Sequence, residues 1–103
     1  MLDNEPGAYF VYIIRCTDDS LYTGITTDLE RRFSEHASRT GRSAKYTRCR
    51  KVQGFEAVWS ASGRAQASRL EYRIKALSRA KKLLLIDGDI EGFDLCGCMR
   101  VTL

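Results

Sequence analysis

The stretch that decides the fold runs from Ala8 to Thr26 and reads AYFVYIIRCTDDSLYTGIT. It holds two short runs rich in β-branched and aromatic residues, 8–16 and 21–26, separated by the turn-forming sequence TDDS. This pattern predicts an antiparallel β-hairpin. Each run carries a tyrosine, Tyr12 in VYI (11–13) and Tyr22 in YTG (22–24). The hairpin therefore decides how the two hydroxyl groups lie relative to each other.

The length of the turn decides on which side of the sheet each tyrosine lies. If residues 16 and 21 are partners, Tyr12 and Tyr22 face opposite sides, whereas an odd-length loop or a bulge puts them on the same side. Gly24 inside a strand indicates a bulge or a close approach by another group. The sequence leaves both arrangements open.

A helix is expected directly after the hairpin, over residues 28–38. Thr27 and Glu30 fit a capping box in which Thr27 is the N-cap. Arg32 and His36 are one turn apart on the apolar side, so both should contact the protein body. Each also has an ordinary explanation: the arginine can pair with a nearby acid, and a lone histidine is usually a satisfied, partly buried side chain.

The rest of the chain supplies one more strand and two more helices. The segment FEAVWS (55–60) predicts a strand with Phe55, Ala57 and Trp59 on one face. Residues 64–77 carry a helical apolar stripe, and 78–86 form a further short helix. We therefore expect an α/β (α+β) domain over 1–86, followed by an acidic, cysteine-containing tail, 87–103, that is loosely held.

The charge of the chain indicates a polyanionic partner. The net charge is +4, from 17 Lys and Arg against 13 Asp and Glu. Four acids lie in 87–103, so 1–86 holds 16 basic and 9 acidic residues. Such a surplus on a small body favours a nucleic acid as partner, although a basic protein with no partner would have it too.

The basic residues are densest between 39 and 51, where no acid occurs and Tyr46 is interleaved with the cations. Basic runs are usually solvated surface, but this density favours a loop that contacts phosphates. The candidate nucleic-acid-binding residues are Arg39, Arg42, Lys45, Arg48, Arg50 and Lys51.

No apolar stretch approaches the roughly 20 residues that a membrane helix needs, and the first eight residues lack a secretory apolar core. We expect a cytoplasmic protein with no membrane contact. Its four cysteines, Cys16, Cys49, Cys96 and Cys98, should then be free thiols. The last two are separated by one residue, fewer than in a usual zinc knuckle.

Glu71 is the candidate metal ligand. It is the only acid within 57–86 and lies at the boundary of the apolar stripe of its helix. Lys75 at i+4 offers the simpler role of a helix ion pair. A carboxylate is also what Mg²⁺ takes from a protein when phosphate and water supply its other ligands. With the two tyrosines, the arginine and the histidine, Glu71 completes a set suited to metal-assisted phosphodiester hydrolysis.

The order of VYI, YTG, DLERRFSEH (28–36) and a later helical glutamate resembles the GIY-YIG nuclease domain. VYI stands for the GIY element and YTG for YIG. Arg32 matches the helix arginine, His36 the histidine one turn on, and Glu71 the metal-binding glutamate. The segment GRSAKYTRCR (41–50) is similar to the small stand-alone GIY-YIG proteins of bacteria. The resemblance covers about residues 8–86 and implies a three-stranded antiparallel sheet flanked by helices.

The resemblance also implies a DNA endonuclease or nickase that uses Mg²⁺ or Mn²⁺. The metal would sit on Glu71 and the scissile phosphate, and Tyr12 would be the general base for the attacking water. Arg32 would favour the phenolate and counter the charge on the pentacovalent phosphate. Tyr22 and His36 would position water or phosphate.

The sequence departs from the family at several points. Val11 and Thr23 replace name-giving residues, and no asparagine clearly follows the glutamate helix. We also expect no second DNA-binding domain. A lone domain whose basic loop, through Lys45, contacts the backbone should read few bases, so a partner protein could supply specificity. We expect DNA, including branched or damaged DNA, to be the substrate in preference to RNA. The process would be DNA repair or processing.

Two other functions stay open. The missing asparagine and the dense cations of 39–51 also suit a nucleic-acid-binding module that has kept the fold and lost turnover. An adaptor that presents its acidic tail, or Cys96 and Cys98, to another protein is the third hypothesis.

Overall fold

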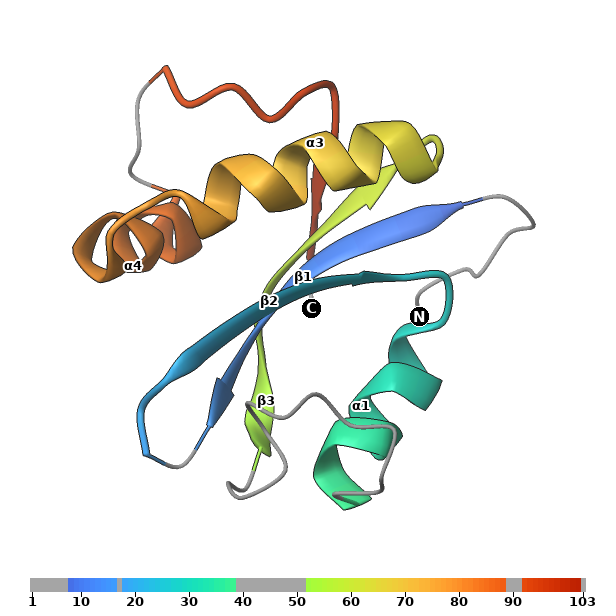
Figure 1. Cartoon of the computed structure of the whole chain (residues 1–103), viewed down its shortest axis with the longest axis vertical. Coiled ribbons are helices and arrows are strands. Elements are labelled where there is room, and N and C mark those ends of the chain that lie inside the picture. The colour runs from blue at the N-terminus through green and yellow to red at the C-terminus, as the bar shows by residue number, and fades with distance from the viewer. Residues whose placement is uncertain (1–7, 17, 39–51, 89–91, 103) are drawn as a thin grey trace.

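The computed structural model describes residues 8–16, 18–38, 52–88 and 92–102, without the side chains at 36–38, 52 and 53. Strands β1 (Tyr9–Cys16) and β2 (Leu21–Thr26) precede helix α1 (Leu29–Ser38). They are followed by β3 (Val52–Ala61), α3 (Arg64–Lys75), α4 (Arg79–Asp87) and β4 (Met99–Val101). The strands form one antiparallel sheet in the order β2-β1-β3-β4. Figure 1 shows α3 and α4 on one side of this sheet and α1 on the other.

Strand β1 divides the hydrophobic core in two. Val11 and Ile13 pack on the side of α3, in a cluster with Trp59, Leu70 and Ile74. The alternate residues of β1, among them Tyr12, pack on the side of α1 with Leu29 and Val58. Every residue from 10 to 14 is at most 4% exposed. The strand is a continuous apolar run because both of its faces are covered. The predicted mixed fold with an antiparallel sheet and flanking helices is confirmed.

A β-bulge in β3 shows that the prediction of one shared face for Phe55, Ala57 and Trp59 was wrong. Ile13 pairs with Ala57, but Ile14 pairs with Phe55, so Glu56 is the extra residue. The bulge places Phe55 in the cluster on the α1 side, while Ala57 and Trp59 stay on the α3 side. Alternation in the sequence could not reveal this, because a bulge inserts one residue and reverses the side of everything before it.

Helix α1 starts close to its predicted position, but its cap differs from the expected Thr27. Asp28 takes the N-cap position, where its Oδ1 accepts the backbone N–H of Arg31 at 3.1 Å. The backbone N–H of Asp28 in turn donates to Thr26 Oγ1 at 3.0 Å. A carboxylate here also interacts favourably with the helix dipole. These two side chains fix the turn from β2 into α1.

Residues 99–101 add a fourth strand to the three that were predicted. This part of the predicted tail is held against the sheet, although we expected the tail to be loosely held. β4 pairs with β3, and the guanidinium of Arg100 lies 5.3 Å from the ring centroid of Trp59. The same guanidinium donates to the carbonyl oxygens of Leu85 and Ile86 at 3.4 and 2.9 Å. Three residues are too few to show a strand pattern in the sequence, so contacts across the chain decide their conformation.

The described cysteines, Cys16, Cys96 and Cys98, are free thiols, as predicted. Of the helices that the structure describes, none is long and apolar enough to cross a membrane.

Candidate active site at the β2 edge

Tyr12 and Tyr22 lie on the same side of the sheet. Arg15 pairs with Leu21, which leaves the odd-length turn 16–20, and Tyr12 lies opposite Gly24. Tyr22 is two residues from Gly24 on β2, so its side chain points the same way. The two ring centroids are 6.5 Å apart. The register therefore brings together the two hydroxyl groups that the sequence could not place.

Gly24 allows Tyr12 to reach the edge of the sheet. β2 is the outer strand next to β1. A Cβ atom at Gly24 would lie 2.5 Å from the Tyr12 hydroxyl oxygen and 2.7 Å from its Cζ. No side chain other than hydrogen fits there, so Gly24 serves a close approach, one of the two roles expected for it. The other role, a bulge, is excluded by the regular pairing of β1 with β2.

Arg32 of α1 has an unsatisfied donor. Its Nε atom lies 3.6 Å from Glu35 Oε1, which is an ion-pair distance but too long for a hydrogen bond. This Nε is buried and makes no hydrogen bond to any group in the described part of the chain. A buried N–H without a partner costs free energy. Arg32 is therefore a donor that a bound acceptor would satisfy.

Glu71 of α3 forms the ion pair that its spacing from Lys75 predicted, with 3.2 Å between Lys75 Nζ and Glu71 Oε2. The Lys75 side chain is 54% exposed and that of Glu71 is 23% exposed. Exposed i,i+4 pairs contribute only about 0.3–0.5 kcal/mol. The pair therefore separates easily, and the ion pair does not prevent Glu71 from binding another cation.

The electrostatics of the Tyr12 hydroxyl connect these groups. Burial raises the pKa of Tyr12 above its ordinary value near 10, and the positive charge of Arg32 opposes the rise. The charges of Tyr22, Glu71 and Glu35 raise the pKa further. Side chains from β1, β2, α1 and α3 therefore lie near enough to Tyr12 for their charges to affect its titration.

A family model described as the GIY-YIG catalytic domain matches residues 8–83. The chain belongs to this family. A UPF0213 protein of Vibrio cholerae serotype O1 (El Tor Inaba N16961) is 48% identical over 86 residues, 81% of each chain. A UPF0213 protein of Desulfotalea psychrophila is 43% identical over 91 residues, 88% of this chain and 82% of its own.

A solved structure supports the same assignment. The solution NMR structure of a UPF0213 protein from Bacillus halodurans matches this GIY-YIG chain with a TM-score of 0.52 at 41% identity. The match covers 87% of this chain and 94% of that one. The resemblance found in the sequence is thus confirmed, including the group of small bacterial proteins.

Some candidate residues of the GIY-YIG site lie outside the described part of the chain. His36 belongs to α1, but its side chain is not described. The basic segment 39–51 lies wholly outside the described residues, and its assignment to nucleic-acid binding stays a prediction. It contains Arg39, Arg42, Lys45, Arg48, Arg50 and Lys51.

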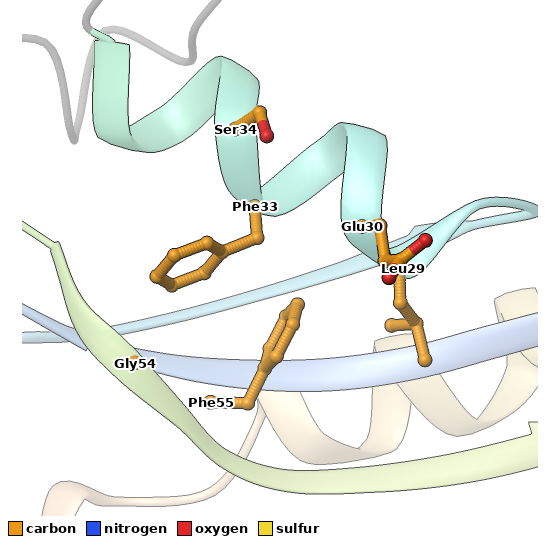
Figure 2. A pocket seen from close by; sticks show the side chains of 6 residues that line it. All are labelled: Leu29, Glu30, Phe33, Ser34, Gly54 and Phe55. Atoms are coloured by element: carbon orange, nitrogen blue, oxygen red, sulfur yellow. The ribbon is translucent and has the colours of Figure 1, made fainter. Parts of the chain in front are cut away.

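Phe55, which contacts Tyr12, and Phe33, which contacts Phe55, were not among the predicted site residues. The Phe55 ring meets Tyr12 edge-on, with 5.6 Å between centroids, and the Phe33 ring lies 5.4 Å from that of Phe55. Figure 2 shows Phe33 of α1 and Phe55 of β3 side by side at a pocket of about 460 Å³. The bulge moves Phe55 to the α1 side of the sheet, whereas the strand pattern in the sequence had placed it on the side of Ala57 and Trp59. Phe55 packs against the cluster that holds Tyr12, and Phe33 packs against Phe55.

The single carboxylate of Glu71 fits a metal ion that takes most of its ligands from substrate phosphate and water. In the described ranges, no three side chains of His, Cys, Asp or Glu gather to hold a metal. Glu71 is a single, partly exposed carboxylate with one oxygen facing Lys75. Mg²⁺ commonly uses one or two carboxylates and takes its remaining ligands from phosphate and water. Glu71 is suited to this kind of binding.

Proposed function

We propose that this chain is a divalent-metal-dependent endonuclease or nickase that hydrolyses phosphodiester bonds in DNA. The observation that carries the proposal is the buried Nε of Arg32, unsatisfied by any described residue, together with the pair of tyrosine rings whose centroids lie 6.5 Å apart beside Gly24; the charges of Arg32 and Glu71 both act on the Tyr12 hydroxyl. A guanidinium, a carboxylate and a phenol are the groups that phosphodiester hydrolysis needs for charge, metal and proton transfer. Membership of the GIY-YIG family supports the same reaction.

In the proposed mechanism, Glu71 would hold Mg²⁺ or Mn²⁺, and the scissile phosphate and water would supply the other ligands. The bound ion would supply positive charge that acidifies nearby hydroxyl groups and neutralises the phosphate. Lys75 must release the Glu71 carboxylate, which the weakness of an exposed ion pair allows. Glu71 contributes the only protein ligand that we assign to this ion.

Tyr12 is proposed to take the proton of the attacking water. Tyr12 is protonated at neutral pH, because burial raises its pKa above the ordinary value near 10 and Arg32 only partly opposes the rise. Tyr12 would therefore lose its proton only when a bound cation, held together with the anionic phosphate, adds positive charge to the site. This requirement would couple deprotonation to substrate binding.

Arg32 is proposed to stabilise the charge that develops on the phosphate, because its buried Nε lacks a hydrogen-bond acceptor. Tyr22 and His36 would position water or a phosphate oxygen. The basic residues of 39–51, with Lys45 among them, would contact the DNA backbone and read few bases. We propose DNA repair or processing as the context, with branched or damaged DNA as candidate substrates and a partner protein supplying specificity.

A plasmid-nicking assay tests this proposal. Supercoiled DNA should become nicked or linear with Mg²⁺ or Mn²⁺ and stay intact with EDTA. Glu71→Gln removes the carboxylate with little change in shape, and we expect it to lower the rate by about 100-fold or more. Circular dichroism should show an unchanged fold.

Lys75→Gln is the matched control for this test. It breaks the same ion pair but keeps the Glu71 carboxylate. Both variants should change the free energy of unfolding by about 0.5 kcal/mol or less, and only Glu71→Gln should stop cutting. Equal nicking rates in the two variants would contradict the role of Glu71 as metal ligand.

A nucleic-acid-binding module with weak or absent turnover is the second candidate. It is favoured by Tyr12, which is 1% exposed and whose raised pKa keeps it neutral. A binding titration beside the nicking assay separates the two functions. Binding that weakens with salt and gives no product with either metal would support the module. Metal-dependent nicking that requires Glu71 would reject it.

A further inference from the structure

A second polar pocket lies at the end of β2 and shares Arg32 with the site described above. Its volume is about 300 Å³, and it is lined by Arg31 and Arg32 of α1, Arg64 of α3, and the threonines at positions 26 and 27. Three arginines and two threonines, together with Tyr9 and Ile25, thus line one hollow. Arginine binds phosphate through paired, charge-assisted hydrogen bonds, and threonine hydroxyls can donate as well.

The charges in this pocket are available to a ligand. Arg31 and Arg64 are exposed. Among the described residues, no carboxylate lies within ion-pair distance of either guanidinium. Three acids lie at or on α1: Asp28 caps the helix through the backbone of Arg31, Glu35 is 3.6 Å from Arg32, and Glu30 lines the other pocket, beside Phe33. The pocket therefore keeps a positive excess.

The pocket and the Tyr12 site follow the same edge of the sheet. Arg64 and Glu71 are seven residues apart on α3, which brings them to nearly the same side of the helix, roughly 10 Å apart along its axis. Thr26 and Gly24 are two residues apart on β2, or roughly 7 Å. Each nucleotide advances a DNA strand by about 3.4 Å along the duplex axis. The offset between the two sites is thus roughly two to three nucleotides.

We propose that Arg31 and Arg64 form a subsite for a second DNA backbone phosphate, roughly two to three nucleotides from the linkage that is cut. The identification of the ligand as DNA rests on the function proposed above. Arg32 lines this pocket, and its charge also acts on the Tyr12 hydroxyl. The subsite orients the strand along β2, so that the scissile phosphate meets Tyr12 and Glu71.

The salt dependence of DNA binding tests the subsite. Binding of a labelled duplex of about 20 base pairs is measured in EDTA, so that no cutting occurs, between about 50 and 200 mM salt. Each phosphate contact contributes about 0.9 to the slope of log affinity against log salt. Arg31→Gln and Arg64→Gln should each lower that slope by about 0.9, and the double variant by about 1.8.

Arg69→Gln and Arg64→Lys are the controls. Arg69 is on the same helix but lines a different pocket, so its loss removes equal charge without removing the contact. Its slope should stay close to that of the unaltered protein, and Arg64→Lys should keep most of the slope that Arg64→Gln loses. A slope in the double variant equal to that of Arg69→Gln would overturn the subsite.

The outcomes distinguish this proposal from the nuclease proposal. If no metal supports cutting but the slopes fall as expected, the subsite stands and the nuclease function fails. If Glu71 is required for cutting but the slopes of the Arg31 and Arg64 variants do not change, the nuclease function stands and the subsite fails.

Discussion

At the scale of single residues, the site depends on the space above Gly24. Gly24→Ala should push the Tyr12 ring away, because the new methyl group would lie 2.5 Å from the hydroxyl oxygen. We expect a loss of about 1–3 kcal/mol in unfolding free energy, as for overpacked cores, and loss of nicking. Urea denaturation and the plasmid assay measure the two effects.

Gly63→Ala is the matched control for Gly24→Ala. A Cβ at Gly63 meets nothing within 4 Å, and its φ of −173° is open to any residue. This variant should nick DNA at the normal rate and lose about 1 kcal/mol at most, because alanine is a poorer N-cap than glycine but no side-chain cap hydrogen bond is lost. If Gly24→Ala behaves like Gly63→Ala, the close approach does not matter for function.

The residues of the site could be chosen from the sequence, but their arrangement could not. Tyr12, Tyr22, Arg32 and Glu71 were recognisable from type and order, and the charges of the other three act on the Tyr12 hydroxyl. The side on which Tyr22 lies depends on whether the turn has an odd or even number of residues, and several turn lengths suit the sequence TDDS. Arg31 and Arg64 were missed because an exposed basic residue on a helix has no local signature.

At the scale of secondary structure, the bulge at Glu56 predicts that deletions of two adjacent residues have opposite effects on stability. Deleting Glu56 would leave Ala57 opposite Ile13 and Phe55 opposite Ile14, with a regular ladder between them. Deleting Ala57 gives a chain of the same length, but it places Glu56 at a position that is fully buried. We expect the first deletion to fold and the second to lose several kcal/mol, because it buries an unpaired carboxylate.

Thermal unfolding followed by circular dichroism compares the two deletion variants, which differ only by alanine or glutamate at one buried position. Similar melting temperatures for both would mean that the strand re-registers instead of losing its bulge. The near-ultraviolet spectrum provides a second check, since Phe55 should keep its contact with Tyr12 only if the bulge is removed cleanly.

The sequence predicted the helices and the first three strands because each carries its own periodicity or turn signals. It could not predict β4 or the bulge, since both depend on partners distant in the chain. Met99 and Arg100 are extended because Ser60 and Trp59 lie opposite them, and no local pattern records that pairing. The same limit applies to Phe55, whose side is set by one extra residue in a neighbouring ladder.

At the scale of the whole molecule, the burial of Tyr12 should appear in the pH dependence of stability. Its folded-state pKa is raised above the unfolded value near 10. The protonated phenol makes its full contribution to the unfolding free energy below pH 10. That contribution is lost as the pH rises, because the unfolded chain releases the proton at a lower pH than the folded chain. The loss from this one group can reach about 1.4 kcal/mol per pH unit. Tyr12→Phe should therefore lose stability less steeply above about pH 10.

Urea denaturation at a series of alkaline pH values measures this difference. Tyr72→Phe is the control, because Tyr72 is 77% exposed and its replacement should leave the slope of the unaltered protein unchanged. Identical slopes for the Tyr12 and Tyr72 variants would show that burial of the phenol does not affect its titration.

The position of β2 as the outer strand has a consequence for how the protein can be dissected. In the described sheet, β2 pairs only with β1, so peptide groups along its other margin face outward. Amide hydrogens there are natural donors to phosphate oxygens, and no change of side chain removes them. Alanine scanning would then leave residual affinity for DNA that no side chain accounts for. Replacing individual amides of this strand by esters through semisynthesis would directly measure how much the backbone N–H groups contribute to DNA affinity.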